Sequence, residues 1–446
     1  MVVREVGGRA IVLGGSMAGL LAARVLSDHY AEVLVLDRDD LLGSTGPRRG
    51  TPQAVHAHAL LARGEQILNE LFPGFTAEVE ASGVPCTDMG QLHWYLDGER
   101  LASVRTGLVV VNATRTDLEQ HVRDRVAAIA NIGFVAGVEI LSPVTDPERT
   151  RVTGVRVHHT AAGTQQTYAA DLVVDTTGRG SRMPVWLREL GYDRPAEERV
   201  KINLSYSSCF FRLPVSPLED SLSIIPLGTP NYPTGAFMGR VKGDRHSLSL
   251  TRMLGAPPPA TIEEFRAAAK ELCTDRIYEA IKDAEPEGPP AVIRFPASVR
   301  RRYEALDRFP ERMVVLGDGL CSFNPIYGQG MTVAALEAMA LRAMLAEGEP
   351  PVPQRFHEAA ARIIDVPWGI AAGGDLAWPE VEGERTPEIE AANAYMGRLQ
   401  SAARFDARIT ETFMRVAGLI DPPDALFAPE IAALVDKFAP AEPTVV

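Results

Sequence analysis

The fold is decided by residues 11–26, which read IVLGGSMAGLLAARVL. An apolar run leads straight into two glycines, and apolar residues then recur at helical spacing. This order of strand, glycine turn and helix is typical of a dinucleotide-binding turn with the pattern G-x-G-x-x-G. Aligned on Gly14, the pattern falls on Gly14, Ser16 and Gly19, so a serine stands at the middle position. A strand–helix connection made of small residues explains this stretch alone equally well.

A second feature favours the nucleotide interpretation. Residues 31–37 read AEVLVLD, a strand rich in branched residues that ends on Asp37, 18 positions after Gly19. An acid at this point accepts hydrogen bonds from a ribose, and the first amides of the helix receive the pyrophosphate. Ser16 keeps a hydroxyl that can donate to phosphate, and Gly15 keeps the turn flexible. We therefore expect a dinucleotide on this turn.

A second strand–loop–helix unit, at residues 314–332, reads VVLGDGLCSFNPIYGQGMT. Asp318 follows the strand, and Pro325, Gly328 and Gly330 come just before the helix. Here the chain resembles the group A flavoprotein monooxygenases, which have the p-hydroxybenzoate hydroxylase fold. The resemblance implies that Asp318 binds the ribityl chain of FAD and that the P-x-x-G-x-G loop lies against the isoalloxazine ring. The following helix would then direct positive potential toward the ring carbonyl that gains negative charge on reduction.

Two further stretches carry the same resemblance. NATRTDLEQHV, at residues 112–122, is similar to the arginine-containing helix start of the family, which implies that Arg115 contacts FAD phosphate or ribityl oxygens. DLVVDTTGRGSR, at residues 171–182, is similar to the fingerprint that the family associates with both FAD and NAD(P)H, with Thr177 in place of an aspartate. The resemblance spans most of the chain up to the end of the late helix.

Within that group, RRGTPQAVHAHALL (48–61) and FNPIYGQGM (323–331) most resemble the flavin-dependent epoxidases of polyether biosynthesis. Phenolic hydroxylases usually carry an Ala-His pair where this chain has Gly319-Leu320. The resemblance implies that Arg49 lies near the flavin and that a flavin C4a-hydroperoxide epoxidises a large apolar, polyketide- or terpenoid-like substrate. It also implies NAD(P)H as the reductant, used directly or through a separate flavin reductase.

The resemblance gives a full set of expected site residues. Those expected to bind FAD are Gly14, Gly15, Ser16, Met17, Ala18, Gly19, Asp37, Arg38, Arg49, Arg115, Asp318, Pro325, Gly328, Gly330 and Met331. No side chain is expected to act as a catalytic group, because the cofactor carries the difficult chemistry and the loop backbone faces it. Tyr206, Phe210 and Phe237 are candidates for a substrate wall, with sheet core as the alternative for each. His56 and His58 have no third ligand at a recognisable spacing, so we expect no metal site.

These patterns predict an α/β chain, α+β overall, with a Rossmann-like FAD domain interleaved with an antiparallel β-sheet substrate domain and followed by a C-terminal helical region. The FAD domain is expected in three parts, at 1–90, 108–198 and 301–350. The substrate domain is expected at 199–300, with a hairpin at 91–107 whose turn is Asp97-Gly98. Residues 351–446 form the predicted helical cap.

Composition narrows the classes of function. The 446 residues carry a net charge of −13, which disfavours a nucleic-acid or anionic-membrane surface. The four cysteines are scattered, as is typical of reduced thiols, and no apolar run is long enough to span a membrane. We therefore expect a cytoplasmic protein.

Several alternatives to the epoxidase remain. An aromatic hydroxylase would use the same cofactor. A flavin-dependent halogenase would need an early active-site lysine and a W-x-W-x-I-P stretch, and this chain has neither. A prenyl-chain reductase or desaturase is a further alternative. A flavin-binding protein without turnover is the last, and Thr177 in the fingerprint gives it some support.

Overall fold

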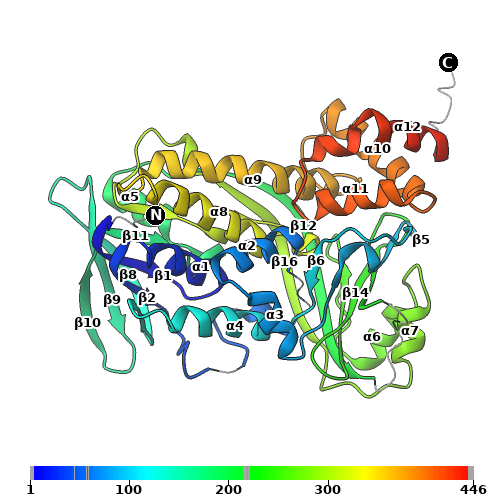
Figure 1. The fold of residues 1–446 in the computed structure, drawn as a ribbon, viewed down its shortest axis with the longest axis horizontal. Coiled ribbons are helices and arrows are strands. Elements are labelled where there is room, and N and C mark those ends of the chain that lie inside the picture. Colours follow the sequence, from blue (N-terminus) through cyan, green and yellow to red (C-terminus); the bar gives the residue numbers. More distant parts are fainter. Residues whose placement is uncertain are drawn as a thin grey trace.

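The computed structural model describes residues 5–44, 46–56, 58, 60–213, 218 and 221–439. The outermost residues of the first and last predicted segments lie outside this set. Figure 1 shows two lobes side by side, with the N-terminal strands in one and a large sheet in the other. The predicted mixture of a Rossmann-like domain, a second sheet domain and C-terminal helices is confirmed.

The first lobe is built on a parallel sheet. Its strand order is β17 (Met313–Val315), β11 (Leu172–Asp175), β1 (Gly7–Leu13), β2 (Tyr30–Leu36) and β7 (Ile132–Val135). All four neighbouring pairs are parallel. The helices α1 (Met17–Leu26), α4 (Arg115–Ala127) and α8 (Gly330–Leu345) pack together in this lobe. Residues 10–13 are fully buried, which fits a parallel strand covered on both faces.

The second lobe is built on an eight-stranded sheet. Its order is β18 (Cys321–Ser322), β16 (Ala291–Arg302), β12 (Ala196–Arg212), β15 (Arg245–Arg252), β14 (Thr234–Arg240), β13 (Ser223–Pro226), β4 (His93–Leu96) and β5 (Glu99–Arg100). Every pair is antiparallel except β13 with β4. That one parallel pair departs from the predicted antiparallel sheet, because the hairpin of β4 and β5 enters from a distant part of the chain. The helices α6 (Ile262–Ala269) and α7 (Arg276–Ile281) cover one face.

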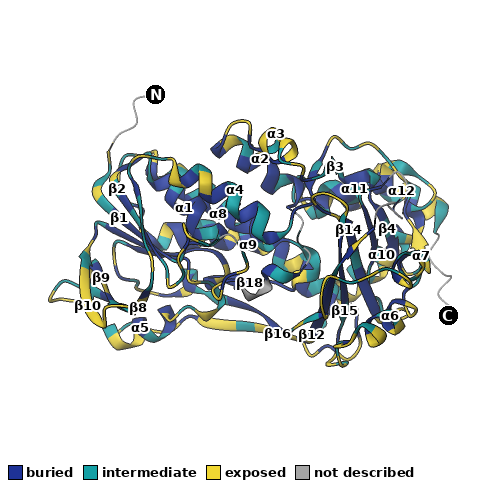
Figure 2. Cartoon of the chain, turned by 90° about the horizontal axis from the view of Figure 1, so that it is seen from below, coloured by how far each residue is buried: buried dark blue, intermediate teal, exposed yellow. Residues whose placement is uncertain are grey.

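Long strands connect the lobes. The strands β12 and β16 pair along most of their length and run from one lobe to the other (Figure 2). The helix α9 (Pro353–Asp375) lies along α8 and ends against β12. The helices α10 (Pro387–Ala403), α11 (Ala407–Ala417) and α12 (Pro429–Phe438) form the C-terminal group above the second lobe (Figure 1). Within the described residues, no helix has the length and apolar character needed to cross a membrane.

The remaining elements complete the first lobe and its edges. They are α2 (Ala62–Leu71), α3 (Phe75–Ala81), β3 (Cys86–Asp88), β6 (Val109–Val111), β8 (Val138–Thr145), β9 (Val152–His159), β10 (Thr164–Ala169) and α5 (Met183–Leu190). The strands β10, β9 and β8 form a separate antiparallel sheet at the far end of this lobe (Figure 1).

The packing of α1 on its sheet yields a first prediction. A Cβ added to Gly19 would lie 1.9 Å from the Gly14 carbonyl oxygen, so Gly19→Ala must push α1 away from the turn. We expect a loss of about 1–3 kcal/mol or more in the free energy of unfolding, measured by denaturant titration. The control is Gly397→Ala in α10, where a Cβ meets nothing within 4 Å. That change should stabilise the protein by up to about 1 kcal/mol. Equal effects at the two sites would contradict the packing argument.

Candidate functional site

The turn between β1 and α1 shows why a serine is tolerated in the glycine pattern. Gly14 has φ +96° and donates its amide to the Leu36 carbonyl at 2.8 Å. Gly19 lies against the Gly14 backbone, as described above. Ser16, by contrast, has φ −88° and ψ −169°, an extended conformation open to any residue, and caps the start of α1. The first amides of α1 therefore point out of the turn without intrahelical partners.

The late motif meets this turn directly. Gly317 has φ +78°, and a Cβ on it would lie 2.9 Å from the Cβ of Ala18. A Cβ on Gly330, the first residue of α8, would lie 3.9 Å from Oδ1 of Asp318. A Cβ on Gly178 would lie 3.9 Å from the Cβ of Asp318. Three segments that are far apart in the sequence therefore converge at the carboxyl edge of the parallel sheet, where α/β folds bind ligands.

Asp318 offers a carboxylate at this meeting point. Its side chain is exposed, and it accepts no hydrogen bond from any residue that the structure describes. The carboxylate oxygens of Asp318 are therefore well placed to accept hydrogen bonds from hydroxyl groups of a bound molecule.

A buried cluster of charges lies beside the turn, on α4. Glu119 is 3% exposed and forms ion pairs with Arg48, with Arg115 at 3.3 Å and with Arg123 at 3.4 Å. Burial alone would raise the pKa of the Glu119 carboxyl, but the charges of Arg115 and Arg48 outweigh it and lower that pKa. Arg115 and Arg123 share this one carboxylate, while Arg48 also lies 3.9 Å from Asp37 and 3.4 Å from Asp39.

Ser16 takes part in the same cluster. Its hydroxyl donates to Oε2 of Glu119 at 2.8 Å and accepts from Nη2 of Arg115 at 2.9 Å. Asp37 directly follows Leu36, the last residue of β2, and its Oδ2 accepts a hydrogen bond from the amide of Gly15 at 2.7 Å. The contact of the Ser16 hydroxyl with phosphate and that of Asp37 with ribose stay predictions, and a phosphate would compete with Glu119 for Ser16.

The two adjacent arginines of the early loop have different environments. Arg48 is 7% exposed, belongs to the Glu119 cluster and also contacts Asp39 at 3.4 Å. Arg49 is exposed, and its carbonyl accepts from the exposed Arg38 at 2.9 Å. Sequence reasoning chose Arg49 and missed Arg48. The FAD contacts of Arg38 and Arg49 stay predictions, while the geometry points to Arg48 as the arginine of this loop nearest the turn.

The loop predicted to face the flavin is held by a helix that the sequence did not connect to it. Asn324, just before Pro325, donates its side-chain amide to Oδ1 of Asp375 at 2.7 Å, and the Tyr327 hydroxyl donates to the same oxygen at 3.2 Å. Gly328 closes the loop with φ +67°. Asp375 is the last residue of α9 and is 1% exposed, and its Oδ2 has no hydrogen-bond partner among the residues that the structure describes. A buried carboxyl therefore fixes the position of the loop.

The surroundings of Asp375 bring the titration of its carboxyl close to neutral pH. Burial raises the pKa of Asp375 to about 7, although the hydrogen bonds from Asn324 and Tyr327 act in the opposite direction. The Tyr206 hydroxyl lies nearby, is also buried and has no partner. No sequence signal marked Asp375, because it lies on a helix far along the chain from the loop.

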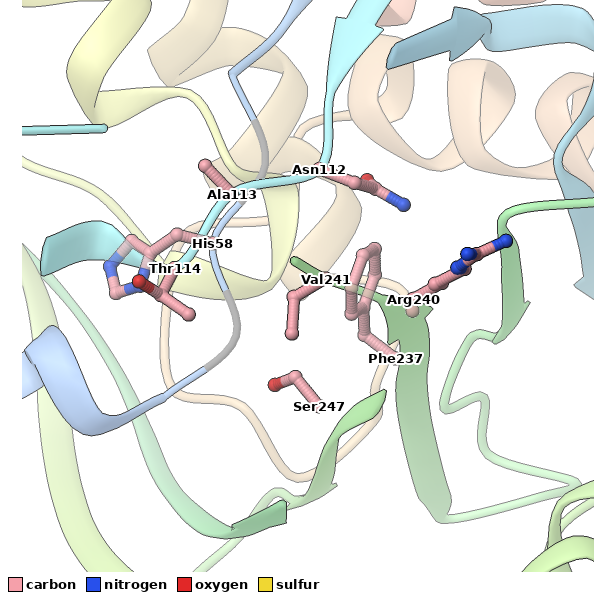
Figure 3. A pocket seen from close by; sticks show the side chains of 9 residues that line it. His58, Asn112, Ala113, Thr114, Phe237, Arg240, Val241 and Ser247 are labelled. Carbon is pink, nitrogen blue, oxygen red and sulfur yellow. The ribbon is translucent and has the colours of Figure 1, made fainter. Parts of the chain in front are cut away.

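The three aromatic candidates lie on the second sheet but do not form one group. Tyr206 packs under the end of α9, with its ring 5.8 Å from that of His56. Phe210 lies under the guanidinium of Arg245, at 4.5 Å. Phe237 lines a pocket between the lobes (Figure 3). Phe210 and Phe237 are both partly exposed, whereas Tyr206 is buried.

His56 and His58 serve as structural side chains. Nδ1 of His56 lies 2.7 Å from the Ser208 hydroxyl, and Nδ1 of His58 lies 2.9 Å from the His56 carbonyl. Burial lowers the pKa of His56 to about 4 and, together with Arg115, that of His58 to about 3. Both rings are therefore neutral near pH 7. Among the residues described, no three His, Cys, Asp or Glu side chains gather as a metal site.

The residues present suit FAD. A small depression beside the turn is lined by Arg48, Arg115 and Arg123 together with their partner Glu119, and the arginines are suited to contact a pyrophosphate. The amides at the start of α1 provide further donors. Asp318 provides an acceptor suited to ribityl hydroxyls, and the start of α8 points at the same place. Met17 and Met331 are buried in the core, so only their backbones can reach the cofactor.

Comparisons with known proteins give the family of the chain. Residues 10–213 match the family described as FAD dependent oxidoreductase. Protein Rv3254 of Mycobacterium tuberculosis is 35% identical over 429 residues, which cover 92% of this chain and 90% of that protein. The chain belongs to the FAD-dependent oxidoreductase family, and FAD is its cofactor.

Solved structures show the same fold. A flavoprotein/dehydrogenase from Cytophaga hutchinsonii is similar with a TM-score of 0.71 at 15% identity, over 97% of this chain and 98% of that one. The p-nitrophenol 4-monooxygenase PnpA from Pseudomonas putida DLL-E4 is similar with a TM-score of 0.66 at 14% identity, over 94% of this chain and 99% of that one. At these identities the likeness establishes the fold.

The arginine cluster yields a second prediction. Arg115→Gln removes a charge beside Ser16 while Glu119 keeps Arg48 and Arg123, so the fold should persist. We expect FAD binding to weaken by about 1–3 kcal/mol, measured by titrating the deflavinated protein and following flavin fluorescence. The control is Arg125→Gln on the same helix, whose guanidinium contacts Glu78 at the surface. Unchanged affinity in Arg115→Gln would exclude Arg115 from the cofactor site.

Asp375 yields a prediction about pH. Its folded pKa of about 7 lies above that of an unfolded aspartate, so the folded state binds more protons and stability falls as pH rises through 7. Histidines with lowered pKa oppose this only below about pH 6.5. Between about pH 6.5 and about 8.5, the melting temperature of the wild-type apoprotein should therefore fall by more than that of the Asp375→Asn variant.

The comparison with Asp375→Asn isolates one group. Burial also raises the pKa of Glu337, to about 8, but this acid is present in both proteins and cancels. Asp307→Asn, a change at an exposed aspartate, serves as the control and should follow the wild type. If the melting temperature of Asp375→Asn fell by as much as that of the wild type over this range, a raised pKa of Asp375 would be ruled out.

Proposed function

We propose that this chain is a FAD-dependent monooxygenase that epoxidises a carbon–carbon double bond of a large, mainly apolar substrate in natural-product biosynthesis, with NAD(P)H as the source of electrons. The observation that carries the proposal is the meeting of Asp318 and the start of α8 with the Ser16 turn. FAD, when bound and reduced, supplies an electrophilic oxygen taken from O₂. An electron-rich alkene can accept that oxygen without a nucleophilic side chain.

The residues of the chain then have the tasks of binding and orientation. Asp318 would accept hydrogen bonds from the ribityl chain, and the amides at the start of α8 would direct positive potential toward the ring. The hydrogen bond between Asn324 and Asp375 would fix the position of the late loop relative to α9. The second sheet would close the site from the other side and exclude water. The sequence similarity of the early and late loops to the polyether epoxidases supports the alkene as the acceptor.

The direct test is product analysis. The purified protein, loaded with FAD, is incubated with NADH or NADPH and O₂, with and without an added flavin reductase, and offered a panel of lipophilic polyenes and phenols. We expect mass spectra with one added oxygen on a polyene, as an epoxide. Oxygen added only to phenols would favour an aromatic hydroxylase. Bound FAD without any oxygenation would favour a flavin-binding protein without turnover.

The flavin-facing loop yields a further prediction, for Gly330. A Cβ there meets no protein atom closer than 3.9 Å, so Gly330→Val should fold normally. It would nevertheless intrude where the cofactor ring is proposed to lie, so we expect loss of FAD retention and of oxygenation, measured by flavin absorbance per protein and by product yield. Gly369→Val in α9, where a Cβ meets nothing within 4 Å, is the control. Normal flavin content and product yield in Gly330→Val would mean that the loop does not face the flavin.

A further inference from the structure

A buried acid of α8 contacts the turn that carries Asp318. Glu337 is 0% exposed, and its Oε2 accepts a hydrogen bond from the amide of Gly317 at 2.6 Å. Its other oxygen, Oε1, has no hydrogen-bond partner among the residues that the structure describes. This acid is thus joined to the cofactor site through one backbone hydrogen bond.

The surroundings of Glu337 differ from those of Glu119, the buried acid beside the first turn. Glu119 is paired with three arginines, whereas Glu337 forms no ion pair within the described part of the chain. Burial raises the pKa of Glu337 to about 8, the negative charge of Asp318 acts in the same direction, and the hydrogen bond from Gly317 opposes both. The neutral carboxyl is therefore favoured at pH 7, so that Oε2 accepts as a carbonyl oxygen and Oε1 carries the proton.

The backbone at Gly317 leaves little freedom in this contact. Gly317 has φ +78°, and a Cβ on it would lie 2.9 Å from the Cβ of Ala18. Its carbonyl accepts from the amide of Leu320 at 2.9 Å, which closes the turn around Asp318. Its own amide is buried and has Glu337 as its acceptor. Without that acceptor the amide would be buried and unpaired, which is unfavourable enough to displace the turn.

The helix α8 contacts this turn at two places. Gly330 and Glu337 are about two helical turns apart, so they lie on the same face of α8. A Cβ on Gly330 would lie 3.9 Å from Oδ1 of Asp318, while Glu337 holds the amide of the preceding residue, Gly317. Helical side chains lean toward the start of their helix, which directs the long Glu337 side chain back toward Gly330. The acid therefore fixes the Asp318 turn relative to the start of α8.

We propose that Glu337 is a positioning residue of the cofactor site, which holds Gly317 and thereby keeps Asp318 where its carboxylate can accept hydrogen bonds from the ribityl hydroxyls of FAD. The inference rests on the proposed function in one respect, the assignment of Asp318 to FAD. Because Glu337 is fully buried, it acts through Asp318 and not by contact with the cofactor. Its removal should therefore weaken FAD binding only as far as Asp318 contributes to it.

The test is a double-mutant cycle on FAD affinity, measured by titrating the deflavinated full chain and following flavin fluorescence. We expect Asp318→Ala and Glu337→Leu each to weaken FAD binding by about tenfold or more. The double variant should lose little more than Asp318→Ala alone, because the carboxylate through which Glu337 acts is already absent. Glu337→Gln should bind FAD like the wild type, since its amide oxygen can accept from Gly317 and its side chain is neutral.

A matched control removes a different carboxylate that accepts backbone amides. Asp88 accepts from the amides of Thr106 at 2.9 Å and of Gly107 at 2.6 Å, and none of these residues belongs to the expected cofactor site. Asp88→Leu should therefore lower the melting temperature and leave FAD affinity unchanged. Circular dichroism of each deflavinated variant shows that it is folded. If Glu337→Leu does not fold, Glu337→Asp, which keeps the acid but is one methylene group shorter, replaces it in the cycle.

Several results would overturn the inference. They are wild-type affinity in Glu337→Leu, an equal loss in Glu337→Gln, an equal loss in Asp88→Leu, and full additivity of the two losses in the double variant. Unchanged affinity in Asp318→Ala would remove both Asp318 and Glu337 from the cofactor site. Epoxide formation by the wild type, measured separately, reports on the proposed function. A wild type that forms an epoxide while the cycle fails would therefore overturn only the positioning role.

Discussion

The site depends on a close approach of backbone segments at the carboxyl edge of the parallel sheet. At Gly14, Gly19 and Gly317 there is no room for a side chain, because each lies against another segment of the same junction. This contact sets the position of the first turn of α1 relative to the Asp318 loop, and α8 begins at Gly330, twelve residues after Asp318. Because the amide donors and the carboxylate belong to segments held in this way, the surface that is proposed to receive the cofactor is positioned by the packing of the protein itself.

The buried charges beside that junction add a second constraint, because they must be paired within the folded protein. Glu119 satisfies three buried arginines, and a buried charge without a partner costs far more than a pair contributes. The protein without nucleotide is thus kept stable by an internal acid at the place where an anion is proposed to bind. An entering pyrophosphate need not displace Glu119 completely, because Arg115 and Arg123 share it and each retains free donors. The arginines of the cluster can therefore be stabilised in the folded protein and still be available to bind an anion.

Local patterns predicted the strands, the turn and the late loop because each pattern consists of residues that are adjacent in the sequence. The spacing of Arg115, Glu119 and Arg123 at helical intervals was also visible and could have revealed the cluster. The choice between Arg48 and Arg49 could not be made, since neighbouring residues in a loop have no periodicity to show which is buried. Asp375 could not be found at all, because only tertiary packing brings the end of α9 to the loop at Asn324.

Side chains alternate between the two faces of the large sheet along each strand, and the two faces differ in polarity. On β15, Leu248 and Leu250 pack against α6 and α7, while Ser247 and Ser249 point the other way. That second face meets the FAD lobe through Ser208 with His56 and through Ser223 with Asn112. A wall built only to hold hydrocarbon would need no hydroxyls, because each buried hydroxyl must find a partner. Most of them find one within the protein. The alternation that stabilises the sheet therefore also gives it one apolar face, which packs against α6 and α7, and one polar face, which meets the FAD lobe.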